Sequence, residues 1–143
     1  MTVTDDQAAA LRAQLAGDYD EHRRLLADLN SRGVLGGYTA LVTAAFIEAV
    51  DRRFGPGHRD DAAVTAFIAG VRSRFPGADD EIDQDTAERV VRKALGRGSI
   101  GDIDGPAIRR VEMLLLPVMV ADEQYSGEEL DRFLAAARKL LGS

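Results

Sequence analysis

Apolar residues recur along most of this chain at steps of three and four positions, the spacing of one face of an α-helix. The stretch 37–54 shows this period most fully, with one face formed by Tyr38, Leu41, Val42, Ala45, Phe46, Ala49, Val50 and Phe54. No segment alternates apolar and polar residues in the period-two pattern of a half-buried strand. The pattern therefore predicts an all-α protein, a compact single-domain bundle of about six helices over residues 1–143.

Capping residues, glycines and prolines set the boundaries of these helices. Two capping boxes, Thr4 with Gln7 and Ser126 with Glu129, mark the N-termini of the first and last helices. In each box a hydroxyl accepts a backbone N–H bond while the longer side chain reaches back to the cap. The six helices are predicted over residues 5–31, 37–54, 61–75, 84–95, 106–124 and 127–141, with either Asp60 or Asp61 as the cap of the third.

The first predicted helix, residues 5–31, contains a glycine near its middle, Gly17. A glycine there costs about 1 kcal/mol relative to alanine, so this is the weak point of the element. The leucines on either side nevertheless keep the helical spacing, from Leu11 to Leu29. We therefore expect one continuous helix rather than two, ending before Gly33.

The predicted helix over residues 106–124 has an unusual composition. All residues of 113–121 are apolar, whereas a surface helix normally carries only an apolar stripe. Two explanations stay open: the helix is central in the bundle, or a second subunit covers its outer face. We expect the central position, with Leu115 and Met119 in the core, and a kink at Pro117, which removes one backbone hydrogen bond. A homodimer is an additional expectation.

Composition and charge narrow the functional classes. The chain has 143 residues, of which 45% are hydrophobic and 29% charged, a balance typical of a globular domain. It contains no cysteine, which excludes disulfides and thiolate-bound metals. The net charge is −6 and no basic stripe is present, so no nucleic-acid partner is expected. Sixteen of the eighteen basic residues are arginine, a bias that GC-rich codons produce.

The sequence shows no targeting or membrane-spanning pattern. Residues 1–6 lack the basic and apolar regions of a secretory signal. The most apolar run, 111–120, has ten residues and includes an acid and a proline, whereas a membrane helix needs about 20 apolar residues. We therefore expect a cytoplasmic protein that does not bind a membrane.

Two glycine-containing segments resemble anion-binding loops. Residues 96–101 read G-x-G-x-x-G, but in a dinucleotide fold those glycines follow a strand, and here residues 86–95 have a helical period. We therefore expect a helix C-terminus followed by a link, and no cofactor. Residues 55–59 include Arg59 and precede a predicted helix, yet this description fits very many loops.

Acidic residues form two clusters that lack the spacing of a calcium loop. An EF-hand needs glycine at position six and glutamate at position twelve. Counted from Asp79, those positions hold Gln84 and Val90, and the segment 102–105 fails in the same way. We expect the acidic side chains of residues 79–85 to favour the N-terminus of the following helix instead.

A third polar cluster, Asp18 with Glu21 and His22, also fails as a metal site. A di-metal helical bundle needs the spacing Glu-x-x-His on two helices. Position 19 is tyrosine, and the only other histidine, His58, lies in a predicted loop. We expect these three side chains to form a solvated polar edge of the helix, and we predict no metal-ligating residue.

Three classes of function remain after these exclusions. No catalytic, cofactor-binding or metal-binding residue is predicted from a motif, which favours a non-catalytic helical protein acting through protein–protein contact or self-association. The alternative is a helical pocket that binds a small apolar or anionic ligand, as a regulator for example. The third is an enzyme with a dispersed acid–base site, using carboxylates such as Asp18 or Glu112.

Overall fold

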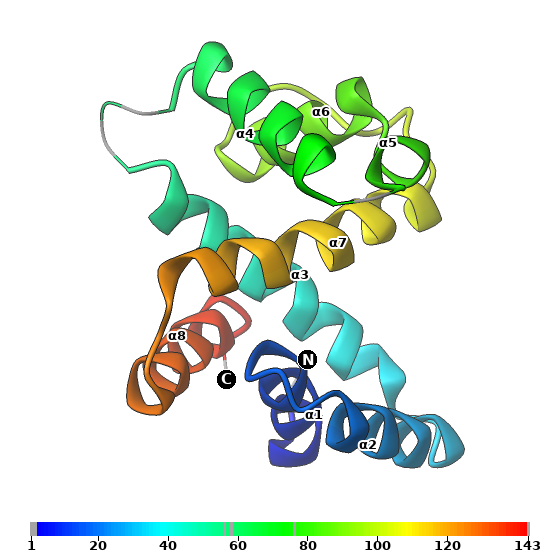
Figure 1. The fold of residues 1–143 in the computed structure, drawn as a ribbon. Helices are drawn as coiled ribbons and strands as arrows, with labels where there is room; N and C mark the ends of the chain where they lie inside the picture. The colour runs from blue at the N-terminus through cyan, green and yellow to red at the C-terminus, as the bar shows by residue number, and fades with distance from the viewer. Residues whose placement is uncertain (1–2, 56, 58, 76, 143) are drawn as a thin grey trace. The chain divides into compact units, whose positions relative to one another are not determined.

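The computed structural model describes residues 3–55, 57, 59–75 and 77–142. The described residues form helices and contain no strand, which confirms the predicted all-α class (Figure 1). The helices are α1 (Asp5–Leu15), α2 (Tyr19–Ser31), α3 (Leu35–Arg53), α4 (Asp61–Arg74), α5 (Ala78–Glu81), α6 (Gln84–Ala94), α7 (Gly105–Glu123) and α8 (Gly127–Leu140). None of these helices is both long and apolar enough to cross a membrane.

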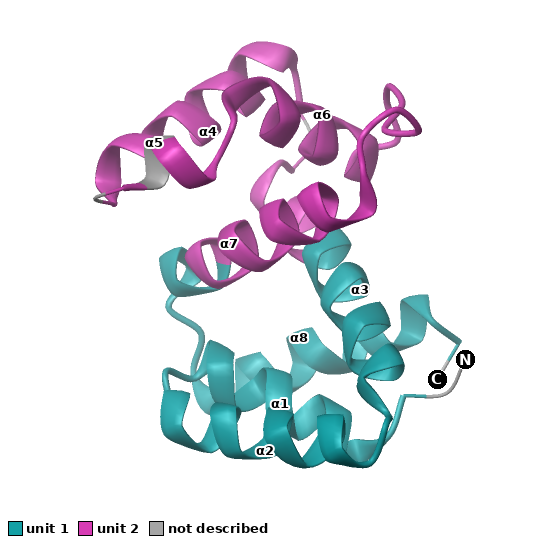
Figure 2. Ribbon diagram, turned by 90° about the vertical axis from the view of Figure 1, so that its right-hand side faces the viewer, with its two compact units in different colours: residues 1–48, 120–143 teal, residues 49–119 magenta. Residues whose placement is uncertain are grey.

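The chain divides into two compact units (Figure 2). Unit 1 comprises residues 1–48 and 120–143, and within it α1 packs against both α2 and α8. Unit 2 comprises residues 49–119, and within it α4 packs against α5 and α6. The two boundaries fall inside α3 and α7, so each of these helices contributes to both units. The organisation of residues 1–143 as one domain stays a prediction.

The prediction of one continuous helix over residues 5–31 is wrong, because the first helix ends at Gly17 and a second one begins after it. Gly17 has a φ of 84°, in the left-handed region that glycine adopts without steric cost. Its N–H donates to the Gln14 carbonyl at 3.1 Å, and the Asp18 N–H donates to the Ala13 carbonyl at 2.9 Å. These two bonds are the Schellman ending of a helix. Asp18 then begins α2 by accepting the Glu21 N–H at 3.4 Å.

The remaining element boundaries agree with the amino-acid pattern to within about two residues. Both predicted capping boxes are present, at Thr4 for α1 and at Ser126 for α8. Aspartates cap two further helices, Asp60 for α4 and Asp83 for α6. The helix count exceeds six because residues 5–31 form two helices and because α5, a single turn, was not predicted. Such a short turn has no hydrophobic period by which to find it.

Helix α7 matches the predicted 106–124 element and is buried on one side. Leu115, Leu116 and Met119 are each no more than 1% exposed, whereas Met113 is 42% exposed. The helix continues through Pro117, and the kink at that residue stays a prediction. The uniformly apolar stretch is therefore half core and half surface in the described chain.

A buried glutamine joins the start of α1 to the turn between α2 and α3. Gln7 is 4% exposed, and its Oε1 accepts the Thr4 N–H at 2.9 Å as part of the capping box. Its Nε2 donates to the Val34 carbonyl at 2.8 Å. The carboxamide lies so close to Gly37 that a methyl group at that position would overlap it. Both the oxygen and the nitrogen of the Gln7 carboxamide are thus hydrogen-bonded, and the glycine opposite leaves room for them.

Gly37→Ala is expected to destabilise the protein, because the Gln7 carboxamide would have to leave its two partners. Losing buried hydrogen bonds of this kind costs about 1–3 kcal/mol. Gly36→Ala is the matched control, since nothing lies within 4 Å of the added Cβ. That variant should be neutral or gain up to about 1 kcal/mol. Urea unfolding of both variants measures the difference, and equal stabilities would contradict the role of Gln7.

Candidate functional site

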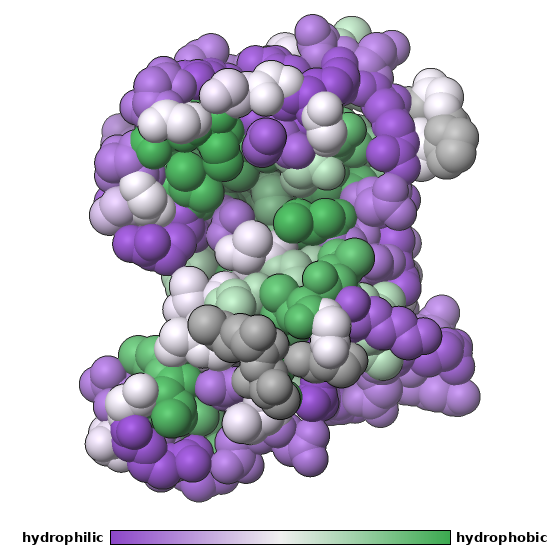
Figure 3. All heavy atoms as spheres, turned by 180° about the vertical axis from the view of Figure 1, so that it is seen from behind, coloured by the Kyte–Doolittle hydropathy of each residue, from purple (hydrophilic) through white to green (hydrophobic). Residues whose placement is uncertain are grey.

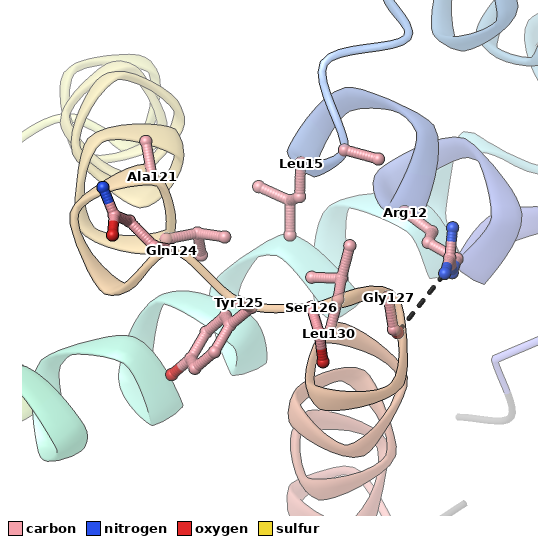
Figure 4. Close-up of a pocket in the computed structure, with 10 residues that line it drawn as sticks. Arg12, Leu15, Ala121, Gln124, Tyr125, Ser126, Gly127 and Leu130 are labelled. Atoms are coloured by element: carbon pink, nitrogen blue, oxygen red, sulfur yellow. Dashed lines mark hydrogen bonds between the residues drawn. The ribbon is translucent and has the colours of Figure 1, made fainter.

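A cavity of about 290 Å³ opens in unit 1 between the C-terminal end of α1, the C-terminal end of α7 and the start of α8 (Figure 4). Its wall is a mixture of small, aliphatic and polar residues. They are Arg12, Leu15, Ala16, Val120, Ala121, Gln124, Tyr125, Ser126, Gly127 and Leu130. In Figure 4, Leu15 and Leu130 lie between Arg12 on one side and Gln124 with Tyr125 on the other. The cavity therefore has an apolar middle and two polar sides.

Arg12 is held in place by α8. Its Nε donates to Asp131 Oδ1 at 2.6 Å, and its Nη2 donates to the Gly127 carbonyl at 3.4 Å. A guanidinium has five N–H donors, and the described residues supply no acceptor for the others. The carboxylate of Asp131 is 61% exposed, so water screens its attraction for Arg12. Arg12 thus presents an oriented positive charge with donors to spare.

The opposite side of the cavity is the link between α7 and α8. Gln124 has a φ of 54°, the one positive φ at a described residue other than glycine. Such strained residues recur at binding sites, where the surrounding structure holds them. The Tyr125 ring packs 5.7 Å from the Phe133 ring, measured between centroids. The carboxamide of Gln124 is exposed and has no hydrogen-bond partner among the described residues.

A second groove, of about 310 Å³, runs between α1 and α8 and shares Arg12 with the cavity. Its floor is formed by Ala8, Ala9, Leu134 and Ala135. At its other end Arg138 donates to Asp5 at 3.1 Å and to the Val3 carbonyl at 2.9 Å. Arg12 and Arg138 therefore make equivalent bridges between α1 and α8, each to one carboxylate and one backbone carbonyl.

The lining of the cavity offers hydrogen-bonding and apolar groups but few groups that titrate. No histidine or carboxylate is among its lining residues. The Ser126 hydroxyl accepts the Glu129 N–H at 3.1 Å as the N-cap of α8, which occupies it in a structural role. What remains is a positive group, an amide, a phenol and aliphatic surface. These groups suit the recognition of a small molecule with one charged end.

The polar cluster predicted at Asp18, Glu21 and His22 has structural roles. Asp18 caps α2, and the Nδ1 of His22 lies 2.7 Å from the Ala10 carbonyl of α1. Glu21 pairs with Arg24, and the hydrogen bond from that guanidinium lowers the pKa of the Glu21 carboxyl. Within the described part of the chain, no group of three metal-ligating side chains comes together.

The other acidic residues singled out in the sequence lie mainly at helix N-termini. Asp83 accepts the Thr86 N–H at 3.0 Å, and this bond lowers the pKa of Asp83. Asp104 accepts the Ala107 N–H at 3.2 Å at the start of α7. The Asp79 side chain, and in the loop 55–59 both Pro56 and His58, lie outside the described residues.

The two carboxylates considered for an enzymatic site belong to different units. Asp18, in unit 1, is exposed and caps α2, whereas Glu112, in unit 2, is 6% exposed on α7. The G-x-G-x-x-G segment follows helix α6, which confirms the predicted helical context. Gly96, with a φ of 86°, ends that helix: its N–H donates to the Lys93 carbonyl at 2.9 Å.

No protein-family model matches this chain, and neither a curated protein nor a solved structure is significantly similar to it. The lining residues of the cavity were not predicted as a site, because no motif links Arg12 to residues 120–130. The one local signal was the polar sequence Gln124-Tyr125-Ser126 between two helices, which is equally typical of an ordinary link.

A polar network in unit 2 centres on Glu88 of α6, whose side chain is 14% exposed. Glu88 accepts hydrogen bonds from the Thr65 hydroxyl of α4, from Gln84 at 2.9 Å and from Arg92 at 3.4 Å. Burial alone raises the pKa of Glu88, but these bonds together outweigh it and leave the pKa below its ordinary value. The ionised carboxylate therefore joins α4 to α6.

This network predicts a pH-dependent stability that Thr65→Val should alter. Because the pKa of Glu88 is lower in the folded chain than in the unfolded one, its contribution is present above the unfolded value, 4.5, and is lost as pH falls through the folded value. Removing the Thr65 hydroxyl raises the folded pKa towards the unfolded value, so the loss of stability with falling pH should be smaller and should end at a higher pH. Unfolding free energies measured between about pH 7 and pH 3 test this.

Thr39→Val is the matched control for that comparison. The Thr39 hydroxyl donates to the Leu35 carbonyl at 3.1 Å, so its removal alters no titrating group. Its effect on stability should therefore be the same at every pH. A Thr65→Val profile parallel to that of Thr39→Val would contradict the proposed coupling of Thr65 to Glu88.

Proposed function

We propose that the cavity beside Arg12 binds a small amphipathic molecule with an anionic end. The observation that carries this proposal is the pairing of an oriented guanidinium with aliphatic surface in one open cavity. Leu15 and Leu130 offer the aliphatic surface, and Arg12 has N–H donors that the described residues do not use. The sequence left such a ligand pocket as the alternative to protein–protein contact, and the cavity now favours it.

The size and polarity of the cavity favour a short-chain carboxylate. Its volume, about 290 Å³, lies near the lower limit of the roughly 300–1,000 Å³ typical of ligand pockets. A guanidinium binds a carboxylate through two parallel hydrogen bonds, a geometry that an ammonium group does not offer. Arg12 is already fixed by Asp131 and Gly127, so little side-chain entropy would be lost on binding.

Hexanoate is a suitable probe, and hexanamide is its uncharged counterpart of the same shape. Hexanoate should raise the melting temperature of the full chain and bind measurably in isothermal titration, and hexanamide should bind more weakly. Arg12→Gln should weaken hexanoate binding by at least about tenfold, the value of a hydrogen bond to a charged group.

Arg138→Gln is the matched control, because Arg138 bridges α1 and α8 as Arg12 does but does not line the cavity. Arg138→Gln should lower the free energy of unfolding by about as much as Arg12→Gln does, but it should leave the affinity for hexanoate unchanged. Equal binding of hexanoate and hexanamide, or equal losses in the two arginine variants, would contradict the proposal.

Self-association, the first expectation from the sequence, is the second candidate and is favoured by the outer face of α7. Met113 is 42% exposed, and Leu114, Pro117 and Val118 of unit 2 are half-buried. Other hydrophobic side chains also reach the surface among hydrophilic ones on the face drawn in Figure 3. A second copy of the chain that covered Met113 would remove this apolar strip from water.

Two substitutions on α7 separate this interface from the core. Met113→Asp places a charge on the exposed face, so the protein should stay folded and pass from dimer to monomer. Leu115→Asp buries an unpaired carboxylate at a position that is 0% exposed, at a cost of several kcal/mol, so the protein should unfold. Light scattering and thermal melting measure both outcomes. A wild-type chain that is monomeric at high concentration would exclude the homodimer.

A further inference from the structure

We propose that unit 2 holds a second binding site, for a small tetrahedral oxyanion such as phosphate or a phosphate monoester. The site is a cavity of about 240 Å³ lined by Arg89 and Arg92 of α6 and by Gly98 and Ser99 of the link that follows. This cavity shares no residue with the cavity beside Arg12, so oxyanion binding here does not depend on the function proposed above.

Arg89 is fixed at this cavity by the link folding back along α6. Its Nη1 donates to Asp102 Oδ2 at 3.0 Å, and its Nη2 donates to Asp102 Oδ1 and, at 2.8 Å, to the Ser99 carbonyl. Hydrogen bonds from Arg89 lower the pKa of Asp102, so the carboxylate is ionised at neutral pH and holds the guanidinium plane. Asp102 is 69% exposed and does not line the cavity, so water screens its charge.

Arg92 is joined to the Glu88 network by one hydrogen bond. Its Nη1 donates to Glu88 Oε1 at 3.4 Å, a long bond that leaves most of its donor capacity unused within the described residues. The Arg92 side chain is 25% exposed, and that of Arg89 is 28% exposed. Both side chains are therefore mostly buried, and both line the same cavity.

The backbone of the link adds two neutral donors. Among the described residues, no backbone carbonyl accepts the N–H of Gly98 or that of Ser99. Gly98 has a φ of 74° and no side chain, so nothing occupies the space beside it. The Ser99 hydroxyl accepts the Gly101 N–H at 3.3 Å and keeps its own O–H to donate. Two arginines, a glycine and a serine thus line the cavity, and no residue with a carboxylate does.

This set of donors matches an oxyanion better than a planar carboxylate. A phosphate group carries at least three acceptor oxygens in a tetrahedral arrangement, and arginine binds phosphate with its paired N–H groups. A single carboxylate offers two oxygens in one plane and would leave several of these donors unpaired. The glycines of the G-x-G-x-x-G segment therefore contribute exposed backbone beside the arginines of α6, and the site uses no helix N-terminus.

The test is a titration of the full-length ¹⁵N-labelled chain with inorganic phosphate at constant ionic strength, with O-phosphoserine and acetate as the other arms. Phosphate should shift the amide signals of Gly98 and Ser99 in a saturable way. If O-phosphoserine binds as tightly as phosphate or more tightly, the ligand is a monoester. If O-phosphoserine does not bind, the ligand is free phosphate. Either result supports the site, whereas acetate binding as tightly as phosphate would overturn the assignment.

Substitutions then locate the binding. Arg92→Gln should weaken phosphate binding by at least about tenfold, the effect of losing charged hydrogen bonds. Arg97→Gln is the control, because Arg97 is on the same link but pairs with Asp61 at 2.8 Å and does not line the cavity. The affinity of Arg97→Gln for phosphate should equal that of the wild type.

Arg92→Lys is a second variant, which tests the same site if Arg92→Gln does not fold. Lysine preserves the charge but loses the paired donors, so its affinity for phosphate should lie between those of the wild type and a neutral residue. Unchanged affinity in the Arg92 variants, or shifts spread over all exposed arginines, would show adventitious ion binding only.

Discussion

One buried carboxamide constrains how unit 1 is built. An unpaired amide in the interior costs roughly 1–3 kcal/mol, so the environment of Gln7 must offer it both an N–H and a carbonyl. Thr4 supplies the first only if α1 begins at Asp5, and Val34 supplies the second only if α2 ends where it does. With its N-terminus fixed in this way, α1 extends for 11 residues, and Arg12 and Leu15 lie near its far end. The cavity beside α8 thus depends on a contact made at the opposite end of the helix.

The sequence was informative where structure is decided locally, and it failed where two local signals compete. The capping boxes at Thr4 and Ser126 were predictable because each involves residues three positions apart. At Gly17 the hydrophobic spacing continues across the break and conceals it. A glycine is a typical C-terminal residue of one helix, and an aspartate followed three residues later by a glutamate is a typical N-terminus of the next. This signal at Gly17, Asp18 and Glu21 should have outweighed the periodicity.

The candidate sites depend on contacts that no local pattern reveals. Arg12 donates to a carboxylate 119 positions away in the sequence, and Arg89 donates to a carbonyl ten positions away, across a change of chain direction. With sixteen arginines in the chain, composition alone could not distinguish these from the others. What distinguishes these two arginines is that each lines a cavity and has a fixed partner that leaves donors unused.

The bridges from Arg12 and Arg138 join the two sequence segments of unit 1, so this unit can be completed only after α8 has been synthesised. Unit 2 is one continuous segment, residues 49–119, whereas unit 1 joins residues 1–48 to residues 120–143. A ribosome releases the chain from its N-terminus, so all of unit 2 emerges while α1 still lacks its partner α8. Contacts between such distant segments also form slowly, because a long loop must close first. The cavity takes most of its wall from residues 120–130, so a nascent chain can form it only after that segment has been synthesised.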